Sequence, residues 1–201
     1  GKTDGSGIKV TTYNITYCTT GMYQNALATA GIEDAEIVVA GPYNISGTAA
    51  LVGAIKSYEN MTGETVSQEN VDTATNELVV TGKLAESVGD SDKAEQLVGA
   101  VKEQVVEGSD NGKKLTEEEI GNVVDQAAQE MDVQLSDEDR QEIVDLMDKI
   151  KGLDIDVDSL KEQAKDLYDK IDDLGLKLDW NQEKVQGFFS KIIEFFKNLF
   201  S

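Results

Sequence analysis

The sequence contains no histidine, one cysteine (Cys18), one arginine (Arg140) and one proline (Pro42) in 201 residues. Without an imidazole, the chain cannot form a Ser-His-Asp triad, a Cys-His pair or a histidine-ligated zinc site. A single cysteine excludes an internal disulfide. No stretch reaches the roughly 18–20 apolar residues that a membrane-spanning helix needs. We therefore expect no catalytic residues, no cofactor, no metal site and no transmembrane segment.

Basic residues are scarce as well, and the acidic excess is unevenly spread. Residues 1–62 hold five acidic residues and three lysines, a net charge of −2, which leaves −19 of the total of −21 for residues 63–201. An acidic surface repels nucleic acids, so we expect no nucleic-acid partner. The step in charge predicts a small α/β unit at 1–62 followed by an acidic helical domain at 63–201.

The first third of the chain alternates between strand and helix patterns. It predicts four elements: a strand at 8–17, a helix at 19–30, a strand at 36–40 and a helix at about 49–60. We expect the apolar second strand to be buried, parallel to the first and ended by Pro42. Residues 4–7 resemble a hairpin turn, so a partner strand is expected upstream, or else this sheet edge is bare.

Two positions near predicted helix N-termini could carry chemistry. Ser46, Gly47 and Thr48 open the second helix, where unpaired N–H groups attract anions, and we treat them as a candidate anion- or ligand-binding site. Ordinary helix capping is the alternative, and it is the interpretation that the residues favour, because the loop has neither the lysine nor the spacing of a nucleotide-binding loop. Cys18 precedes the first helix, a location that lowers a thiol pKa, although the alternative is a small buried apolar residue.

The acidic region, residues 63–201, is predicted to form successive capped helices. Capping-box patterns begin at Thr116, Ser136 and Ser159, each followed by an amphipathic stretch. Apolar residues from Ile143 to Leu178 step by three and four, which is typical of one long coiled-coil helix. Gly152 and the alternating segment 153–158 instead favour two helices with a break at that point.

Asp154, Asp156 and Asp158 form a weak calcium candidate, since alternate carboxylates occur in EF-hand loops. That loop requires glycine at its sixth position and glutamate at its twelfth, and Ser159 and Lys165 stand there. Capping aspartates are the alternative.

The C-terminal segment is the most apolar part of the chain and carries a wide helical stripe. It must be buried, either against this chain's own helices or in a partner or membrane surface. As a partner-docking candidate it comprises Phe188, Phe189, Ile192, Phe195, Phe196, Leu199 and Phe200.

Several segments resemble one known family. Residues 8–17, the run from Met22 to Ile32 and, most specifically, Ser46–Leu51 are similar to the YpuA-type family of Gram-positive bacteria, as are later segments at 135–138, 143–147 and 153–158. The family is known only as a domain of unknown function. The resemblance implies an exported protein whose signal peptide has been removed, and it implies no activity and no catalytic residues.

Together these observations predict an α+β protein with a small strand-helix-strand-helix unit followed by a mostly helical region. We expect a secreted or cell-envelope protein that is not an enzyme and acts by binding an unknown protein or envelope component. A carboxylate-based hydrolase of cell-wall polymers is one alternative. The other is a helical docking module that uses the Phe-rich C-terminal helix. The oligomeric state is left open.

Overall fold

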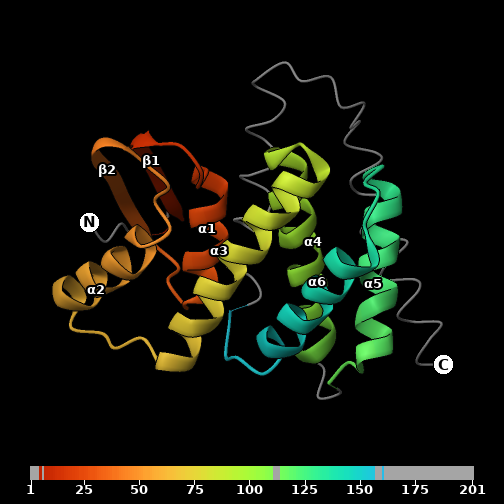
Figure 1. Cartoon of the computed structure of the whole chain (residues 1–201). Coiled ribbons are helices and arrows are strands. Elements are labelled where there is room, and N and C mark those ends of the chain that lie inside the picture. The colour runs from red at the N-terminus through yellow and green to blue at the C-terminus, as the bar shows by residue number, and fades with distance from the viewer. Residues whose placement is uncertain (1–4, 6, 111–113, 157–159, 161–201) are drawn as a thin grey trace. The chain divides into compact units, whose positions relative to one another are not determined.

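The computed structural model describes residues 5, 7–110, 114–156 and 160. The chain divides into two compact units, Gly1–Lys165 and Asp166–Ser201, and all described residues belong to the first. Within that part, the elements follow one another (Figure 1) as β1 (Ile8–Ile15), α1 (Thr20–Thr29), β2 (Ala35–Ile45), α2 (Ala50–Thr62), α3 (Gln68–Val88), α4 (Ser91–Asp110), α5 (Glu117–Glu130) and α6 (Asp137–Ile150). Early strands followed by helices confirm the predicted α+β class.

The first three elements form a parallel strand-helix-strand unit, as predicted. β1 and β2 pair in parallel with Ile8 opposite Ala35, and α1 connects them and packs against β1. Thr19 caps α1 by accepting a hydrogen bond from the Met22 amide at 3.1 Å, which satisfies one of the unpaired N–H groups of the first turn.

The prediction that Pro42 ends the second strand is wrong. β2 continues to Ile45, because the pairing shifts around Pro42: Tyr13 lies opposite Ala40 but Ile15 lies opposite Ile45. Four residues of β2 therefore bulge against one residue of β1. Proline is tolerated in such a bulge since no ladder hydrogen bond requires its missing N–H.

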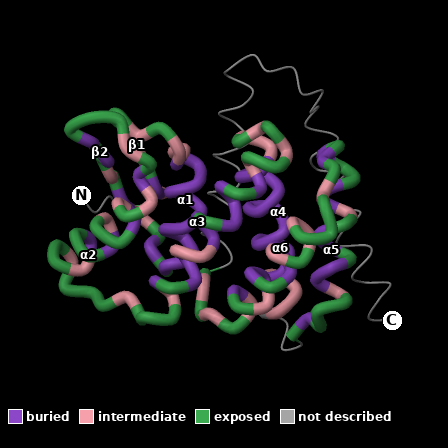
Figure 2. The backbone as a smooth tube through the Cα atoms, in the orientation of Figure 1, coloured by how far each residue is buried: buried purple, intermediate pink, exposed green. Residues whose placement is uncertain are grey.

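The expectation that the second strand is fully buried is also wrong. Ala35 and Val39 are buried, but the intervening Val38 is 62% exposed. Glu36, Val38 and Ala40 alternate with these residues and are all exposed, so the second face of β2 is open to solvent. Figure 2 shows mixed burial along the strands and α2, in contrast to the almost continuous buried colour of α4.

The helices from α3 onward pack around α4. α4 contacts α1, α3, α5 and α6, and it is buried from Ala94 to Val106. The predicted boundary near residue 62 falls in the connection between α2 and α3. Helices from both sides of it pack together, since α1 contacts α3 and α4.

A buried ion pair joins three of these helices. Lys102 of α4 donates to the Glu77 carboxylate of α3 at 2.8 Å, and to the Asn25 carbonyl at 2.8 Å and the Thr29 hydroxyl at 3.2 Å, both on α1. Thr29 also donates to Glu77. The Lys102 side chain is 2% exposed and that of Glu77 is fully buried. Each charge is therefore tolerated only because the other is present.

The helix starts predicted at Thr116 and Ser136 are confirmed, and both form complete capping boxes. The third, at Ser159, lies outside the described residues. α6 ends at Ile150, followed by a turn at Lys151 and Gly152, so a single unbroken helix through residues 143–178 is wrong. Glycine and the β-branched, aspartate-rich segment after it disfavour helix at this point.

Candidate functional site

The loop Ser46-Gly47-Thr48 lies before α2, and its central residue is held by the Tyr23 side chain of α1 and by the first amide of α2. The Gly47 carbonyl accepts a hydrogen bond from the buried Tyr23 hydroxyl at 2.5 Å and another from the Ala50 amide at 2.9 Å. α2 has Ala49 at its N-cap, without a capping side chain. Ser46 and Thr48 are at least partly exposed, with their hydroxyl oxygens 3.5 Å apart. Anion binding at this loop stays a prediction.

The other predicted site residues are brought together only in part. Asp154 and Asp156 line a cavity of about 50 Å³ together with Leu160 and residues of the α1–β2 connection. Asp158 and the Phe-rich segment, from Phe188 to Phe200, lie outside the described residues. Among the described residues, no group of three or more acidic or cysteine side chains is arranged to hold a metal ion.

Cys18 does not have the activated thiol predicted from its location. Burial raises the pKa of this thiol, and a hydrogen bond with Tyr23 opposes the effect only in part. Desolvation caused by burial thus has a larger effect on this pKa than the hydrogen bond. Burial also raises the pKa of the neighbouring Tyr23 phenol. This pair belongs to the packing beneath Gly47.

The most site-like feature of the described residues is a groove of about 400 Å³ between β2 and α2. Its first wall is the stretch of β2 from Ala35 to Ala40. Its second wall is one side of α2, whose residues follow helical spacing and are mostly small: Ala50, Gly53, Ala54, Ser57, Tyr58 and Met61. A Cβ atom on Gly53 would meet nothing within 4 Å, so the groove is open beside it.

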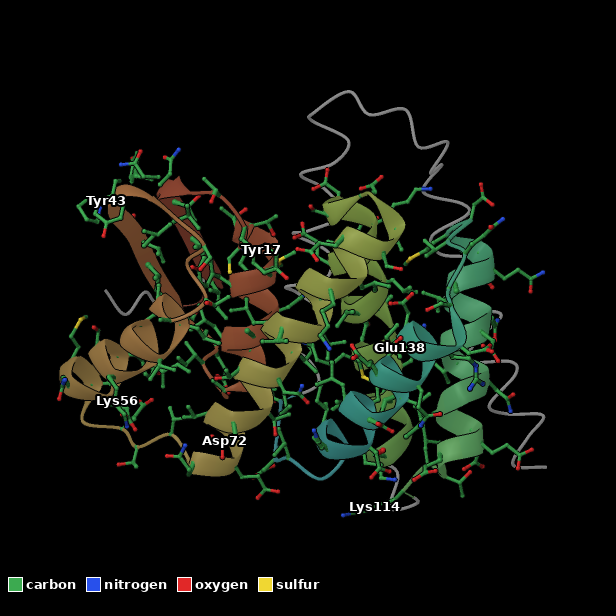
Figure 3. All side chains as sticks on the ribbon, in the orientation of Figure 1. Tyr17, Tyr43, Lys56, Asp72, Lys114 and Glu138 are labelled. Atoms are coloured by element: carbon green, nitrogen blue, oxygen red, sulfur yellow. The ribbon has the colours of Figure 1, made fainter. Side chains whose placement is uncertain are left out.

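Exposed apolar side chains gather on the elements that form this groove. Val38 and Met61 line the groove and are 62% and 61% exposed. Two more exposed apolar residues, Tyr43 and Val52, lie on the same strand and helix, and a third, Tyr13, lies on the neighbouring β1. Figure 3 shows Tyr43 turned outward at the far end of β2, and Lys56 on α2. Such a concentration is typical of an interaction surface.

The main chain of β2 offers hydrogen-bonding groups toward the groove. The Ala35 amide donates to the Gly7 carbonyl at 3.2 Å, so Ala35, and with it every second residue, faces β1. The N–H and C=O groups of Val38 and Ala40 therefore point to the opposite edge of β2. No further strand pairs with that edge in the part of the chain that the structure describes.

Sequence reasoning missed this groove, although a signal for it was present. Ala50, Gly53, Ala54 and Ser57 recur at three- and four-residue spacing on one side of the predicted helix, directly after an apolar strand. A stripe of small residues shows where a helix permits close approach. It does not show which element, if any, lies against it.

The ionisation of Tyr58, which lies in one wall of the groove, makes the stability of the protein depend on pH. Burial, a hydrogen bond donated to Glu64 at 2.6 Å and the nearby charges of Glu64, Glu33 and Asp34 raise the pKa of its phenol from 10 to about 12. A raised folded-state pKa contributes stability that is complete below pH 10 and is lost as the pH rises through about 12. We expect the free energy of unfolding to fall across this window, and to fall less steeply in Tyr58→Phe. Urea denaturation at successive pH values measures the slope, and identical slopes in both proteins would contradict this assignment.

The fold and the groove together define a class: an α+β protein with a parallel strand-helix-strand unit, a strand edge that no described strand pairs with, and a helical region. The chain belongs to the family described as "Protein of unknown function (DUF1002)", whose model matches residues 1–167. It is similar to the uncharacterized protein YpuA of Bacillus subtilis (strain 168), with 39% identity over 159 residues. That match covers 79% of this chain and 53% of YpuA, so the chain spans about half the length of this relative. No solved structure matches it.

These comparisons confirm the predicted resemblance to a YpuA-type family of unknown function. Within the part of the chain that the structure describes, no helix is both long and apolar enough to cross a bilayer.

Proposed function

We propose that this chain is a non-enzymatic protein of the cell envelope or the extracellular space, and that it acts by binding polypeptide in the groove between β2 and α2. One observation carries the proposal: an open apolar groove has a strand edge, with main-chain donors and acceptors, as one of its walls. An extended peptide satisfies such an edge by adding as a further strand. The family resemblance supports the location.

The electrostatics of the described carboxyl groups favours binding over acid–base hydrolysis. A general acid at neutral pH needs a raised carboxyl pKa. A hydrogen bond from Lys56 lowers the pKa of Glu59, and a main-chain hydrogen bond from Val66 lowers it further. Partial burial opposes ionisation of Asp139, but hydrogen bonds from Ser136 and Ser87 outweigh it and lower the pKa. Both shifts are opposite to the raised pKa that the general acid of a glycoside hydrolase requires.

The composition of the groove favours polypeptide over other envelope components. Its walls are mainly small and apolar, and its main-chain groups alternate in the spacing of a β-strand. Sugar-binding sites usually display aromatic platforms, and the walls offer only Tyr58. The acidic chain as a whole repels nucleic acids.

The proposal is tested with the full chain and two fluorescent six-residue peptides, one apolar and β-branched, the other identical except for a central proline. Fluorescence anisotropy should show binding of the first and none of the second, because proline cannot complete the strand ladder. Gly53→Leu, which fills the groove, should abolish binding. Val79→Leu, at an exposed site on α3, should not.

Turnover assays complete the test. Peptidoglycan, peptide and ester substrates should remain intact in the presence of the purified chain. Measurable hydrolysis of any of them, or equal binding of both fluorescent peptides, would remove the basis for a non-enzymatic strand-binding function.

A further inference from the structure

We infer that the strand received by this groove is β2 of a second copy of the chain, so that two copies join edge to edge into a four-stranded sheet. This inference rests on the proposed function, because it names the polypeptide that the groove binds. Three independent features of β2 support it: the sparse edge protection, the register that self-pairing allows, and the charge of the surrounding surface.

Between Ala35 and Ala40, β2 carries only one of the devices that usually keep an edge strand from pairing, the charge of Glu36. Natural edge strands carry lysine, proline or a bulge where another strand could add. Between Ala35 and Ala40, β2 has no lysine, no proline and no bulge, and Val38 at its centre is 62% exposed. The bulge and Pro42 lie beyond Ala40, so they limit the pairing segment to these six residues without blocking it. An edge of this kind is expected to be covered in the working protein.

β2 is complementary to itself when a twofold axis passes through Val38. The N–H and C=O groups of Val38 point to the free edge, so Val38 can exchange two hydrogen bonds with Val38 of the second copy. In this register, Glu36 lies opposite Ala40 of the second copy. The two Glu36 carboxylates therefore do not face each other, which avoids a like-charge pair.

The charge distribution makes this surface the one most suited to self-association. Residues 1–62 carry a net charge of −2 and residues 63–201 carry −19. Two copies that meet through the helical region would bring most of their negative charge together. Contact through β2 and α2 joins the least charged parts and covers Val38 and Met61. The small residues of α2 leave room for the main chain of the incoming strand.

Sedimentation equilibrium of the full chain tests this inference. The wild type should form a dimer. Val38→Lys, which sets two lysines opposite each other at the axis, should raise the dimer dissociation constant by about fivefold. Val79→Lys makes the same change at an exposed valine on α3 and should leave the constant unchanged. Gly53→Leu provides a second groove variant that favours helix, so it should fold and should also weaken the dimer.

Disulfide crosslinking tests the proposed register between the two copies of β2. In an antiparallel hydrogen-bonded pair the Cα atoms lie about 5.5 Å apart, within the range that a disulfide can bridge. Val38→Cys should give a covalent dimer on mild oxidation, whereas Val79→Cys should not, and the native Cys18 is buried.

The inference is overturned if the wild type sediments as a monomer, if Val38→Lys leaves the dimer intact, or if Val38→Lys and Val79→Lys weaken it equally. A monomer that still binds the apolar peptide would remove only the second copy as partner and leave the proposed function standing. Loss of both peptide binding and dimerisation would remove both.

Discussion

Replacing Lys102 by methionine is expected to lower the free energy of unfolding by about 3–5 kcal/mol. The substitution leaves the buried Glu77 carboxylate without its cation, 2.8 Å from where the ammonium group lies. It also removes the donor that satisfies the Asn25 carbonyl and helps to satisfy the Thr29 hydroxyl. Because these groups come from α1, α3 and α4, the loss should affect the contact between the strand-helix-strand unit and the helical region. Urea denaturation followed by circular dichroism measures the change.

A surface ion pair in the same protein provides the matched control. Lys83 on α3 contacts Glu142 on α6 at 2.5 Å, but its side chain is mostly exposed. Lys83→Met should therefore change the free energy of unfolding by at most about 1 kcal/mol. The double variant Lys102→Met with Glu77→Leu should recover part of the loss, since no buried charge remains. Equal effects of the Lys102 and Lys83 substitutions would mean that the buried pair contributes no more than an exposed one.

Gly47→Ala is expected to lower the free energy of unfolding by roughly 2–5 kcal/mol, for two additive reasons. Gly47 has φ +90°, a conformation that side chains with a Cβ atom rarely adopt. A Cβ atom there would also overlap the Tyr23 hydroxyl and lie 2.6 Å from the Ile15 Cγ2 atom. Tyr23 is fully buried, so it cannot move away without disturbing the packing of α1 against β1.

Gly89→Ala separates the two contributions. Gly89 has φ +76° at the end of α3, and a Cβ atom there would meet nothing within 4 Å. Only the backbone strain applies, so a loss of about 1 kcal/mol is expected. The excess at Gly47 measures the overlap with Tyr23. If both variants lose the same stability, the loop before α2 can relax away from Tyr23, and its rigid placement in the structure would be contradicted.

The elements of this fold follow closely from local sequence. Thr19 caps α1, Thr116 and Ser136 open α5 and α6 with capping boxes, and the two early strands pair in parallel as predicted. These features depend on short-range chemistry: a side-chain oxygen reaches an amide three residues away, and β-branched residues favour extended chain. Such features can be predicted from the sequence because the interacting groups are close together in it.

The candidate site could not be predicted from the sequence, for a specific reason. The run at 36–40 looks like a buried strand, and its apolar side chains are the same whether one or both faces are covered. Val38 is exposed because its face of the described sheet is open to solvent, a property of the tertiary structure that the strand's own residues do not encode. Likewise, the residues around Ser46-Gly47-Thr48 do not indicate that Tyr23, 24 residues from Gly47, donates a hydrogen bond to the Gly47 carbonyl.

By itself the sequence determined the helices, the strands, the family and the uneven charge, because each depends on residue types and their spacing along the chain. Only the tertiary structure decided that Lys102 and Glu77 form one buried pair and that β2 and α2 enclose a groove. Those features arise where segments distant in sequence meet, and the free energy of a buried charge or an unpaired strand edge depends on what lies beside it.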